Sequence, residues 1–557
     1  MTNNLLKGSD NITEKRLVVL TAMFIWFAFF VQLKMTRIMC GDYYKEAEKQ
    51  TVRSVDISTG RADIVDCNLK NITGTENQIK ALITNETDLQ KVFESIREED
   101  REKFYEQVQN ETAAVVDLVN PVHSDMIYTT SKRYSSLNMA QHLIGYVDID
   151  NNGIAGIERA YNKELKDNGE NIKVNFNVNG AGDIYGDIHN TTSAPEKVLS
   201  LTIDSSLQRI CEKVANESIP NGSIVILESK TGKIRAMAST PTYDANNIVD
   251  FLDAENSPLL NKAIQSYEPG SVIKPLWAAT FLENGFNKDD VYYCKGYTTV
   301  NGHTYHCANN KVHGEVDLEK ALVVSCNCYF IDNFIKDKGF YFCQMANQVN
   351  FGKELTLCDD YYTAAGNFPT TTQIENMGVQ SSTCFGQGSF RVTPVHIAAY
   401  MNMFANNGIY VYPQVVEGIY NRQTKECEKK IYEYDAKQVI TEQTADTVKN
   451  MLVSVVKDGA QGRACPEYFN AGGKTGTAQT GKTKENGEEI FTAWFCGFYP
   501  AEDPKYTICI TMCDGGESSV SAAPLFKEIC DMIFYSEYAG KEEVNSQITV
   551  DKTDKNK

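Results

Sequence analysis

Ser271 and Lys274, three residues apart, form the pattern in this chain that most directly suggests chemistry. If a helix begins near Ser271, this spacing places the hydroxyl and the amine on one face, close enough to hydrogen-bond. Gly270 permits a tight entry into such a helix, and Pro275 is tolerated because the first turn has backbone donors to spare. A neutral lysine amine can then take the proton of the serine hydroxyl. The stretch therefore predicts a serine nucleophile that is activated by lysine.

The same spacing recurs at Ser454 and Lys457, so the pattern alone does not identify a nucleophile. These residues follow a run of helical periodicity at 445–453, and Asp458-Gly459 comes directly after them. A lysine in the last turn of a helix interacts favourably with the helix dipole. We therefore expect Lys457 to be an ordinary cation at a helix C-terminus.

Two further motifs follow the Ser271 stretch at wide intervals, Ser325-Cys326-Asn327 and Lys474-Thr475-Gly476-Thr477. Together with Ser271-x-x-Lys274, and in this order, they resemble the three signatures of the penicillin-binding protein and serine β-lactamase superfamily. A second copy of the last motif, Lys230-Thr231-Gly232, precedes the candidate nucleophile and is excluded by its order. It joins two strand-like runs, which is typical of a hairpin turn.

This resemblance implies an α+β fold, in which an antiparallel sheet flanked by helices is joined to an all-helical subdomain. Alternating, strand-like runs at 223–227, 234–238, 491–498 and 506–513 support the sheet. The glycines around Lys474 open another strand and allow a ligand to approach its backbone closely. We expect this transpeptidase domain to span 199–538, followed by a disordered charged tail at 539–557.

The resemblance also implies a role for each motif residue. Ser271 is the expected nucleophile, Lys274 its base, and Ser325 the relay that carries a proton to the leaving nitrogen. The helix dipole and a neighbouring cation are expected to keep the Lys274 amine partly neutral. The residues implied in substrate binding are Asn327, Lys474, Thr475, Gly476 and Thr477.

Within that set, Asn327 is expected to hold the substrate amide and Lys274. Lys474, Thr475 and Thr477 are expected to bind a terminal carboxylate. The backbone N–H groups of Ser271 and Thr477 are expected to form the oxyanion hole.

Near the N-terminus, residues 17–33 are apolar and carry no charge. With Lys15, Arg16 and Lys34 extending it at either end, this stretch predicts a transmembrane helix at 17–36, preceded by a short cytoplasmic tail at 1–16. A cleaved signal peptide is the competing interpretation, but no convincing small-residue cleavage site follows. Flanking charges do not settle the orientation. The resemblance implies a single-pass protein of the bacterial cell membrane with its catalytic domain outside.

Residues 37–198 are polar and mixed, and they resemble the elongated, dimerisation-type pedestal of class B penicillin-binding proteins. The matching positions are Arg53 and the stretches 60–66, 142–147 and 153–161. The first stretch departs from the family pattern Arg-Gly-x-Ile-x-Asp, because Ala62 stands in place of the glycine. Further along the chain, Gly386-Gln387-Gly388 resembles another segment of the family.

The function implied is that of a peptidoglycan D,D-transpeptidase, which cross-links stem peptides through a Ser271 acyl-enzyme, releases D-alanine and is acylated by β-lactams. No region resembles a glycan-polymerising domain, so a separate membrane-embedded glycan polymerase is an implied partner. A β-lactamase or β-lactam sensor, a carboxypeptidase and a catalytically silent scaffold of the division or sporulation machinery stay open. The net charge of −19 and the lack of a basic stripe argue against nucleic acid as a partner.

Sixteen cysteines are many for an exported protein. Most of them stand singly in apolar runs, so we expect mainly free, buried thiols. Cys294 and Cys307 bracket a turn-rich loop and are the best candidates for a disulfide, although the sequence is equally compatible with two free thiols at these positions. Zinc on His303, His306 and Cys307 is the alternative for this loop, but the spacing fits no common site. We therefore predict no metal and no cofactor.

Overall fold

The computed structural model describes residues 6–40, 52–84, 89–110, 113–120, 126–135, 139–179, 184–336, 339–459 and 462–538. The tail predicted at 539–557 lies outside the described residues, as do residues 1–5 of the predicted cytoplasmic tail. Contacts divide the chain into two compact units. Unit 1 consists of Met1–Gly60, Asn77–Ser131 and Glu170–Ala194, and unit 2 of Arg61–Glu76, Lys132–Gly169 and Pro195–Lys557.

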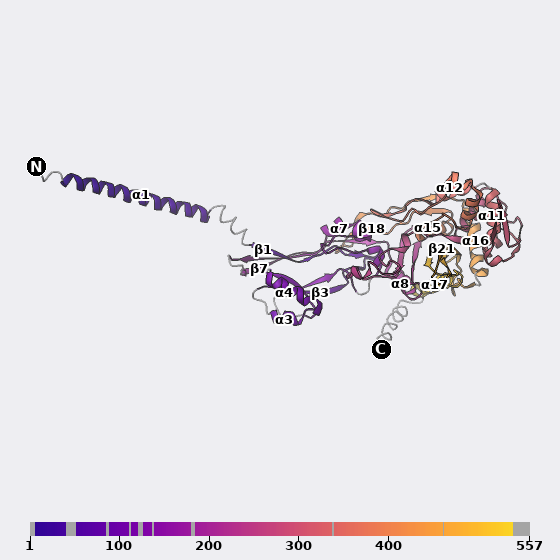
Figure 1. Ribbon diagram of the computed structural model, residues 1–557, viewed down its shortest axis with the longest axis horizontal. Coiled ribbons are helices and arrows are strands. Elements are labelled where there is room, and N and C mark those ends of the chain that lie inside the picture. The colour runs from indigo at the N-terminus through magenta and orange to yellow at the C-terminus, as the bar shows by residue number, and fades with distance from the viewer. Residues whose placement is uncertain are drawn as a thin grey trace. The chain divides into compact units, whose positions relative to one another are not determined.

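The first helix, α1 (Leu6–Cys40), is drawn in indigo in Figure 1. Its apolar part, Glu14–Cys40, has 27 residues, which corresponds to about 40 Å of helix. This exceeds the about 30 Å of a bilayer's hydrocarbon core, so the helix is long and apolar enough to cross a membrane. The predicted segment 17–36 lies within α1. The helix extends beyond it on both sides because the flanking lysines, arginines and glutamate are themselves good helix formers.

Unit 1 contains two three-stranded sheets with helices beside the second, and both strand pairs of the first sheet are antiparallel. Their cores are small apolar clusters, in which strand residues such as Ile57 and Val174 meet, or helix residues such as Val92 and Phe104. The sheets have the orders β1 (Val52–Thr59)–β6 (Asn171–Val178)–β7 (Ile184–Ser193) and β4 (Ala114–Leu118)–β3 (Glu76–Ile83)–β5 (Ile127–Lys132), and the helices are α3 (Leu89–Glu94), η1 (Glu98–Asp100) and α4 (Arg101–Asn110).

Unit 2 is built on a five-stranded antiparallel sheet, in which β21 is an edge strand. The predicted strands correspond to four of the five, and the predicted strand around Lys474 is the fifth. Their order is β10 (Ile234–Thr240)–β9 (Gly222–Glu228)–β23 (Tyr506–Cys513)–β22 (Glu489–Tyr499)–β21 (Gly472–Thr483). The expected α+β class is therefore confirmed.

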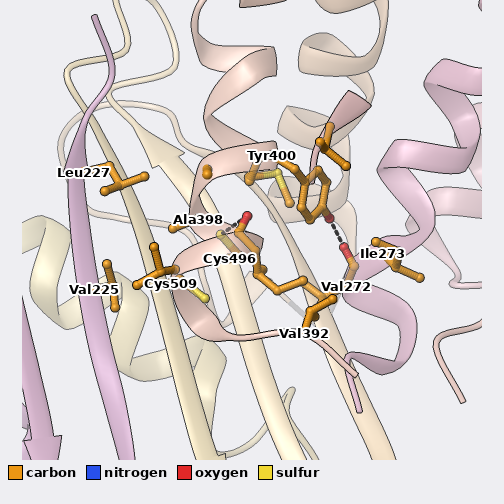
Figure 2. Packing of buried hydrophobic residues seen from close by; sticks show 14 of the residues in the cluster. Val225, Leu227, Val272, Ile273, Val392, Ala398, Tyr400, Cys496 and Cys509 are labelled. Carbon is orange, nitrogen blue, oxygen red and sulfur yellow. Dashed lines mark hydrogen bonds between the residues drawn. The ribbon is translucent and has the colours of Figure 1, made fainter. Parts of the chain in front are cut away.

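Helices cover each face of this sheet. Consecutive strand residues point to opposite sides, so apolar residues lie on both faces and pack against helices on both. In β9, Ile224 and Ile226 pack in the cluster that contains residues of α8 (Ser205–Ser218) and α17 (Ala522–Tyr538). Val225 and Leu227 belong instead to the larger cluster that includes α15 (Pro394–Ala405). Figure 2 shows this second face, with Tyr400 of α15 packed among the residues drawn.

The helices of the predicted all-helical subdomain pack against one another, and the last of them also contacts the sheet strand that carries Lys474. They are α9 (Lys274–Glu283), α10 (Leu318–Val323), α11 (Asn327–Lys336), α12 (Phe340–Gln348), α13 (Thr371–Ile374), α14 (Met377–Cys384) and α16 (Glu442–Asp458). The region also contains two antiparallel ribbons that periodicity did not predict, because their strands have only three or four residues each. These are β11 (Tyr292–Cys294) with β14 (Gly314–Val316) and β12 (Tyr297–Val300) with β13 (His303–His306).

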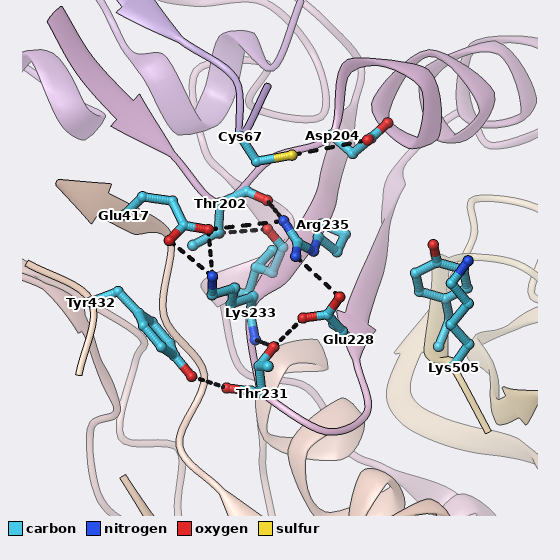
Figure 3. A network of polar contacts seen from close by, with 12 residues as sticks. Cys67, Thr202, Asp204, Glu228, Thr231, Lys233, Arg235, Glu417, Tyr432 and Lys505 are labelled. Atoms are coloured by element: carbon cyan, nitrogen blue, oxygen red, sulfur yellow. Dashed lines mark hydrogen bonds and ion pairs between the residues drawn. The ribbon is translucent and has the colours of Figure 1, made fainter. Parts of the chain in front are cut away.

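The hairpin turn predicted at Lys230-Thr231-Gly232 is confirmed, since it joins β9 to β10. A polar network fixes it, as Figure 3 shows. Lys233 contacts Glu417 at 2.7 Å, and Tyr432 donates a hydrogen bond of 2.8 Å to the Thr231 carbonyl. This second copy of the Lys-Thr-Gly motif is thus a structural turn.

A buried ion cluster lies in the part of unit 2 that precedes this sheet in the chain. Glu158 is fully buried and accepts hydrogen bonds from Arg61 at 2.7 Å and from Arg133 at 2.6 Å. These residues belong to the predicted pedestal, yet 61–76 and 132–169 group with unit 2. The compact units and the predicted domains are therefore different divisions of the chain.

The remaining elements of unit 2 are short. They are β2 (Ile64–Val65), α5 (Gln141–Ile144), α6 (Gly156–Ala160), α7 (Asn162–Asp167), β8 (Lys197–Leu201), η2 (Ile248–Phe251), η3 (Lys262–Ile264), η4 (Gly270–Ile273), η5 (Ala308–Asn310), β15 (Thr356–Cys358), β16 (Tyr361–Tyr362), β17 (Ile409–Val411), β18 (Val416–Asn421), β19 (Cys427–Lys430) and β20 (Ala436–Gln438).

Candidate active site

Ser271 lies in the single 3₁₀ turn η4 (Gly270–Ile273), and the α-helix begins only at Lys274. The expected α-helical start at Ser271 is therefore corrected by one turn. Gly270, with φ of +59°, bends the chain into this turn, and Pro275 lies in the first turn of α9, where no backbone donor is needed. A 3₁₀ turn has three residues per turn, so the Ser271 and Lys274 side chains still project on the same side.

Lys274 is fully buried, and its ammonium has three hydrogen-bond acceptors. Its Nζ donates to the Ser325 carbonyl at 2.8 Å, to the Ser325 Oγ at 3.2 Å and to Asn327 Oδ1 at 2.7 Å. Burial lowers the pKa of Lys274 to about 8. An appreciable fraction of this amine is therefore neutral near neutral pH, as a base requires.

Ser325 occupies the sharp turn between α10 and α11, with a φ of +52°. This left-handed conformation is uncommon for serine and costs free energy. It directs both the carbonyl and the hydroxyl of Ser325 toward Lys274. Asn327 follows at the start of α11, where its Nδ2 donates to the His306 carbonyl at 3.0 Å and thereby fixes the side-chain amide.

Lys474 lies on the edge strand β21 and is also buried, with 1% of its surface exposed. Its Nζ donates to the carbonyl of Thr475 at 3.1 Å and to its Oγ1 at 3.4 Å. Among the described residues, no carboxylate lies within salt-bridge distance of this ammonium. Burial, reinforced by the charge of Lys274, lowers the pKa of Lys474 well below its usual range. An anionic ligand beside Lys474 would offset this penalty and favour its charged form.

Strand β21 and turn η4 approach each other so closely that glycine is required at both. A Cβ on Gly476 would lie 2.6 Å from the Pro269 carbonyl oxygen, and one on Gly270 would lie 2.9 Å from that of Thr477. Thr477 is exposed, and its hydroxyl pairs with Ser518 at 2.8 Å. The N–H groups of Ser271 and Thr477 thus belong to two elements in direct contact.

Three residues outside the three motifs hold the Ser271 turn. Trp494 Nε1 donates to the Glu268 carbonyl at 2.9 Å. The Tyr400 hydroxyl donates to the Val272 carbonyl, as Figure 2 shows. The Gly386 carbonyl accepts from Gly270 N–H at 2.9 Å. Only Gly386 had a sequence signal, through the Gly-Gln-Gly segment, because the two aromatic residues resemble any others in apolar runs.

The structure therefore brings Lys274, Ser325 and Asn327 into direct contact, beside the Ser271 turn and the Lys474 strand. The second Ser-x-x-Lys pair lies elsewhere. Lys457 is in the last turn of α16, and Ser454 Oγ donates to Glu319 at 2.7 Å. The prediction of an ordinary helix terminus at Lys457 is confirmed.

The thiol that lies between Ser325 and Asn327, Cys326, belongs to a group of potential metal ligands. The Sγ atoms of Cys294 and Cys307 are 3.7 Å apart, beyond the about 2.05 Å of a disulfide, so the favoured disulfide pairing is not formed. Of the residues weighed for zinc, Cys307 belongs to this group, whereas His303 and His306 are exposed on β13. The other members are Cys294 and His313.

Known proteins resemble this chain in sequence. The family model described as "Penicillin binding protein transpeptidase domain" matches residues 222–531. Stage V sporulation protein D of Bacillus subtilis is 30% identical over 68% of this chain and 59% of its own length. Peptidoglycan D,D-transpeptidase MrdA of Haemophilus influenzae is 26% identical over 72% of this chain and 65% of its own length. The chain thus spans about three fifths of these relatives.

Solved structures share the fold. Penicillin-binding protein 3 of Mycobacterium tuberculosis, complexed with aztreonam, has a TM-score of 0.64 and 22% identity, covering 87% of this chain and 97% of that one. Penicillin-binding protein PBP2 of Helicobacter pylori, in complex with MreC, has a TM-score of 0.65 and 21% identity, covering 87% and 99%. Since the family model spans more than half of the sequence, the chain belongs to the penicillin-binding protein transpeptidase family, as one of its class B members.

Proposed function

We propose that this protein is a peptidoglycan D,D-transpeptidase that works through an acyl-enzyme on Ser271. The observation that carries the proposal is the contact of the buried Lys274 amine with Ser325 and Asn327, in a site that also contains the buried Lys474. A lysine base, and a second lysine that has no carboxylate partner among the described residues, suit attack on a substrate that ends in a carboxylate.

In the first half-reaction, Ser271 Oγ attacks the carbonyl between two D-alanines of a stem peptide. Its proton passes to the neutral Nζ of Lys274. The C–N bond then breaks, and Ser325 Oγ gives a proton to the departing amine while receiving one from Lys274. The 3.2 Å contact between Lys274 Nζ and Ser325 Oγ supports this relay. D-Alanine leaves, and an ester remains on Ser271.

We assign substrate binding to the polar side chains and backbone N–H groups of the site. Lys474, with Thr475 and Thr477, binds the terminal carboxylate, and Asn327 binds a substrate amide. The N–H groups of Ser271 and Thr477 stabilise the oxyanion, which is worth roughly 3 kcal/mol per donor in related chemistry. The amine of a second stem peptide then attacks the ester, forms the cross-link and regenerates Ser271.

The second part of this proposal is that the chain is anchored in the membrane and that its catalytic unit lies outside the cytoplasm. Helix α1 anchors the chain in the bacterial cell membrane as a single span, and the catalytic unit faces the side where stem peptides are cross-linked. A separate membrane-embedded glycan polymerase is the proposed partner. One fold relative, with a TM-score of 0.68 and 21% identity over 95% of this chain and 99% of that chain, comes from work titled "Structural coordination of polymerization and crosslinking by a peptidoglycan synthase complex".

Labelling with a fluorescent penicillin tests the proposal. The full chain in detergent is expected to form a stable covalent adduct on Ser271, identified by mass spectrometry of the digested protein. Ser271→Ala should abolish the adduct. Ser454→Ala, which removes the other Ser-x-x-Lys serine, should leave it intact. Rapid turnover of the adduct would indicate a β-lactamase, and a folded protein without any adduct would indicate a silent scaffold.

A further inference from the structure

Four side chains next to the catalytic motif converge on one point. Cys294 ends β11, Cys307 follows β13, His313 precedes β14, and Cys326 precedes α11. Their ligand atoms all lie within 4.8 Å of one another. The three cysteines are buried and the histidine is half-buried. Four segments that are separate in the sequence thus present three thiols and an imidazole to a common centre.

Three of the six distances within this group are close to the edges of a tetrahedral metal site, and the other three are no longer than 4.8 Å. The Sγ atom of Cys307 lies 3.7 Å from the Sγ of Cys294 and 3.8 Å from the Sγ of Cys326, and Cys294 Sγ lies 3.5 Å from His313 Nδ1. Zinc binds sulfur at about 2.3 Å and histidine nitrogen at about 2.05 Å, so a tetrahedron has S–S edges of about 3.8 Å and S–N edges of about 3.5 Å. Disulfide bonding would require about 2.05 Å.

Two of the sulfurs each accept a hydrogen bond from a backbone N–H group. Gly296 N–H donates to Cys294 Sγ at 3.4 Å, and Tyr329 N–H donates to Cys326 Sγ at 3.4 Å. Such donors stabilise a thiolate, which is the form that binds a metal, and they orient the ligand. A fifth thiol, Cys328, lies 3.4 Å from Cys307 Sγ, shorter than a tetrahedral S–S edge, and stands outside the group of four.

The surrounding ribbons pack on α11, where Tyr292 and Thr298 both donate hydrogen bonds to Asp332, at 2.6 and 2.7 Å. The β11–β14 and β12–β13 pairs have two strands each, and most residues of β12 and β13 are exposed. Two-stranded ribbons of this size are marginally stable in water without further packing. A metal bound by residues at their ends would join both ribbons to the start of α11.

We propose that Cys294, Cys307, His313 and Cys326 bind one Zn²⁺ ion in a closed, tetrahedral, structural site. On binding, the three thiols release their protons to solvent, and the imidazole binds in its neutral form, so the site carries a net charge of −1. Three thiolates with one imidazole in a tetrahedron favour zinc over the harder divalent cations. All four coordination positions are filled by the protein, so the ion itself takes no substrate.

The ion would also position the catalytic motif, because Cys326 lies between Ser325 and Asn327. Fixing Cys326 holds the left-handed turn at Ser325 and the start of α11, and both neighbours contact Lys274. The four ligands are therefore positioning residues for the proposed acylation chemistry. This second part rests on the proposed function, whereas zinc binding itself does not.

Metal analysis of the full chain in detergent, by inductively coupled plasma mass spectrometry, tests the site. We expect about one zinc per chain in the wild type, and loss of it in Cys307→Ala. Cys211→Ala, which removes a buried thiol of α8, is the matched control and should keep the zinc. His313→Ala changes only a half-buried loop residue and should lose the metal while the protein stays folded. Cobalt substitution should give sulfur-to-cobalt charge-transfer absorption in the control but not in Cys307→Ala.

Several outcomes would overturn the proposal. The first is an equal zinc content in Cys307→Ala and Cys211→Ala. The second is iron in place of zinc in the wild type, and the third is a metal-free wild type in which Cys307 forms a disulfide. The positioning role has its own readout. Removing zinc with a chelator under reducing conditions should slow penicillin acylation roughly 10- to 100-fold, and adding zinc should restore it. An unchanged rate in the metal-free protein would refute positioning, while loss of labelling in Ser271→Ala tests the proposed function separately.

Discussion

Lys274 Nζ lies 2.7 Å from Asn327 Oδ1, although 53 residues separate them in the sequence. The contact joins the helix that follows the Ser271 turn to the helix that follows the Ser325 turn. Because the Asn327 amide is held from its other side by the His306 carbonyl, its oxygen is fixed toward the lysine. The environment of the proposed base is therefore neutral and hydrogen-bonded, and the predictions below follow from this and related contacts.

The acylation rate should depend on pH through Lys274. Only the neutral amine can accept the Ser271 proton, and burial lowers the pKa of Lys274 to about 8. The second-order rate constant with penicillin should therefore rise about tenfold per pH unit below 8 and level off above it. Lys274→Met should lower the plateau roughly 100- to 10,000-fold, whereas Lys457→Met should not change it. Stopped-flow acylation across pH measures both. A flat profile in the wild type would contradict the role of Lys274 as base.

Asn327→Asp should move this profile to higher pH. A carboxylate at the position of Oδ1 would pair with the Lys274 ammonium and raise its pKa, by about one to three units for such a pair. Asn327→Ala removes the acceptor without adding charge, so it should slow acylation without the upward shift. The same pH series measures both variants. Identical midpoints in Asn327→Asp and the wild type would show that Lys274 does not control the rate.

Gly386→Ala should destabilise the nucleophile turn. At φ of +75°, a Cβ on Gly386 would overlap the backbone of Gly270. Gly285→Ala is a matched control, because φ there is +78° and a Cβ would have nothing within 4 Å. Both variants suffer the left-handed backbone strain, so Gly386→Ala should lose about 1–3 kcal/mol more in the free energy of unfolding. Thermal and denaturant unfolding compare the two, and equal losses would mean that the contact with Gly270 does not constrain the turn.

Glu158→Gln should be strongly destabilising. The carboxylate is fully buried between Arg61 and Arg133, so neutralising it leaves two cations without their counter-charge. Loss of one partner in a buried ion pair costs about 3–5 kcal/mol. Glu467→Gln breaks an exposed pair with Lys527 and should cost less than about 1 kcal/mol. Urea titration of the full chain distinguishes the two, and a small effect of Glu158→Gln would indicate that the arginines find other acceptors.

Local patterns in the sequence were sufficient to predict many of the strands, turns and helix ends of the fold. Alternation predicted the strands of the central sheet, and a turn-forming triplet between two such runs predicted the β9–β10 hairpin. Helical periodicity and the final lysine identified Lys457 as a helix terminus. These predictions hold because a strand, a turn and a helix end are each determined by residues that are neighbours in the chain.

Other features were decided by the tertiary structure alone. The 3₁₀ turn at Ser271 depends on the backbones of Gly386 and Gly476, which are far from it in sequence and leave no room for a Cβ. The thiol and imidazole group was not predictable because His313 carries no motif, and Cys294, Cys307 and Cys326 meet only through the folding of two short ribbons onto α11. Sequence spacing determines which side chains can share one helix face or one strand face. Which distant segments pack against each other is decided by the complementarity of their surfaces, and this exists only in the folded chain.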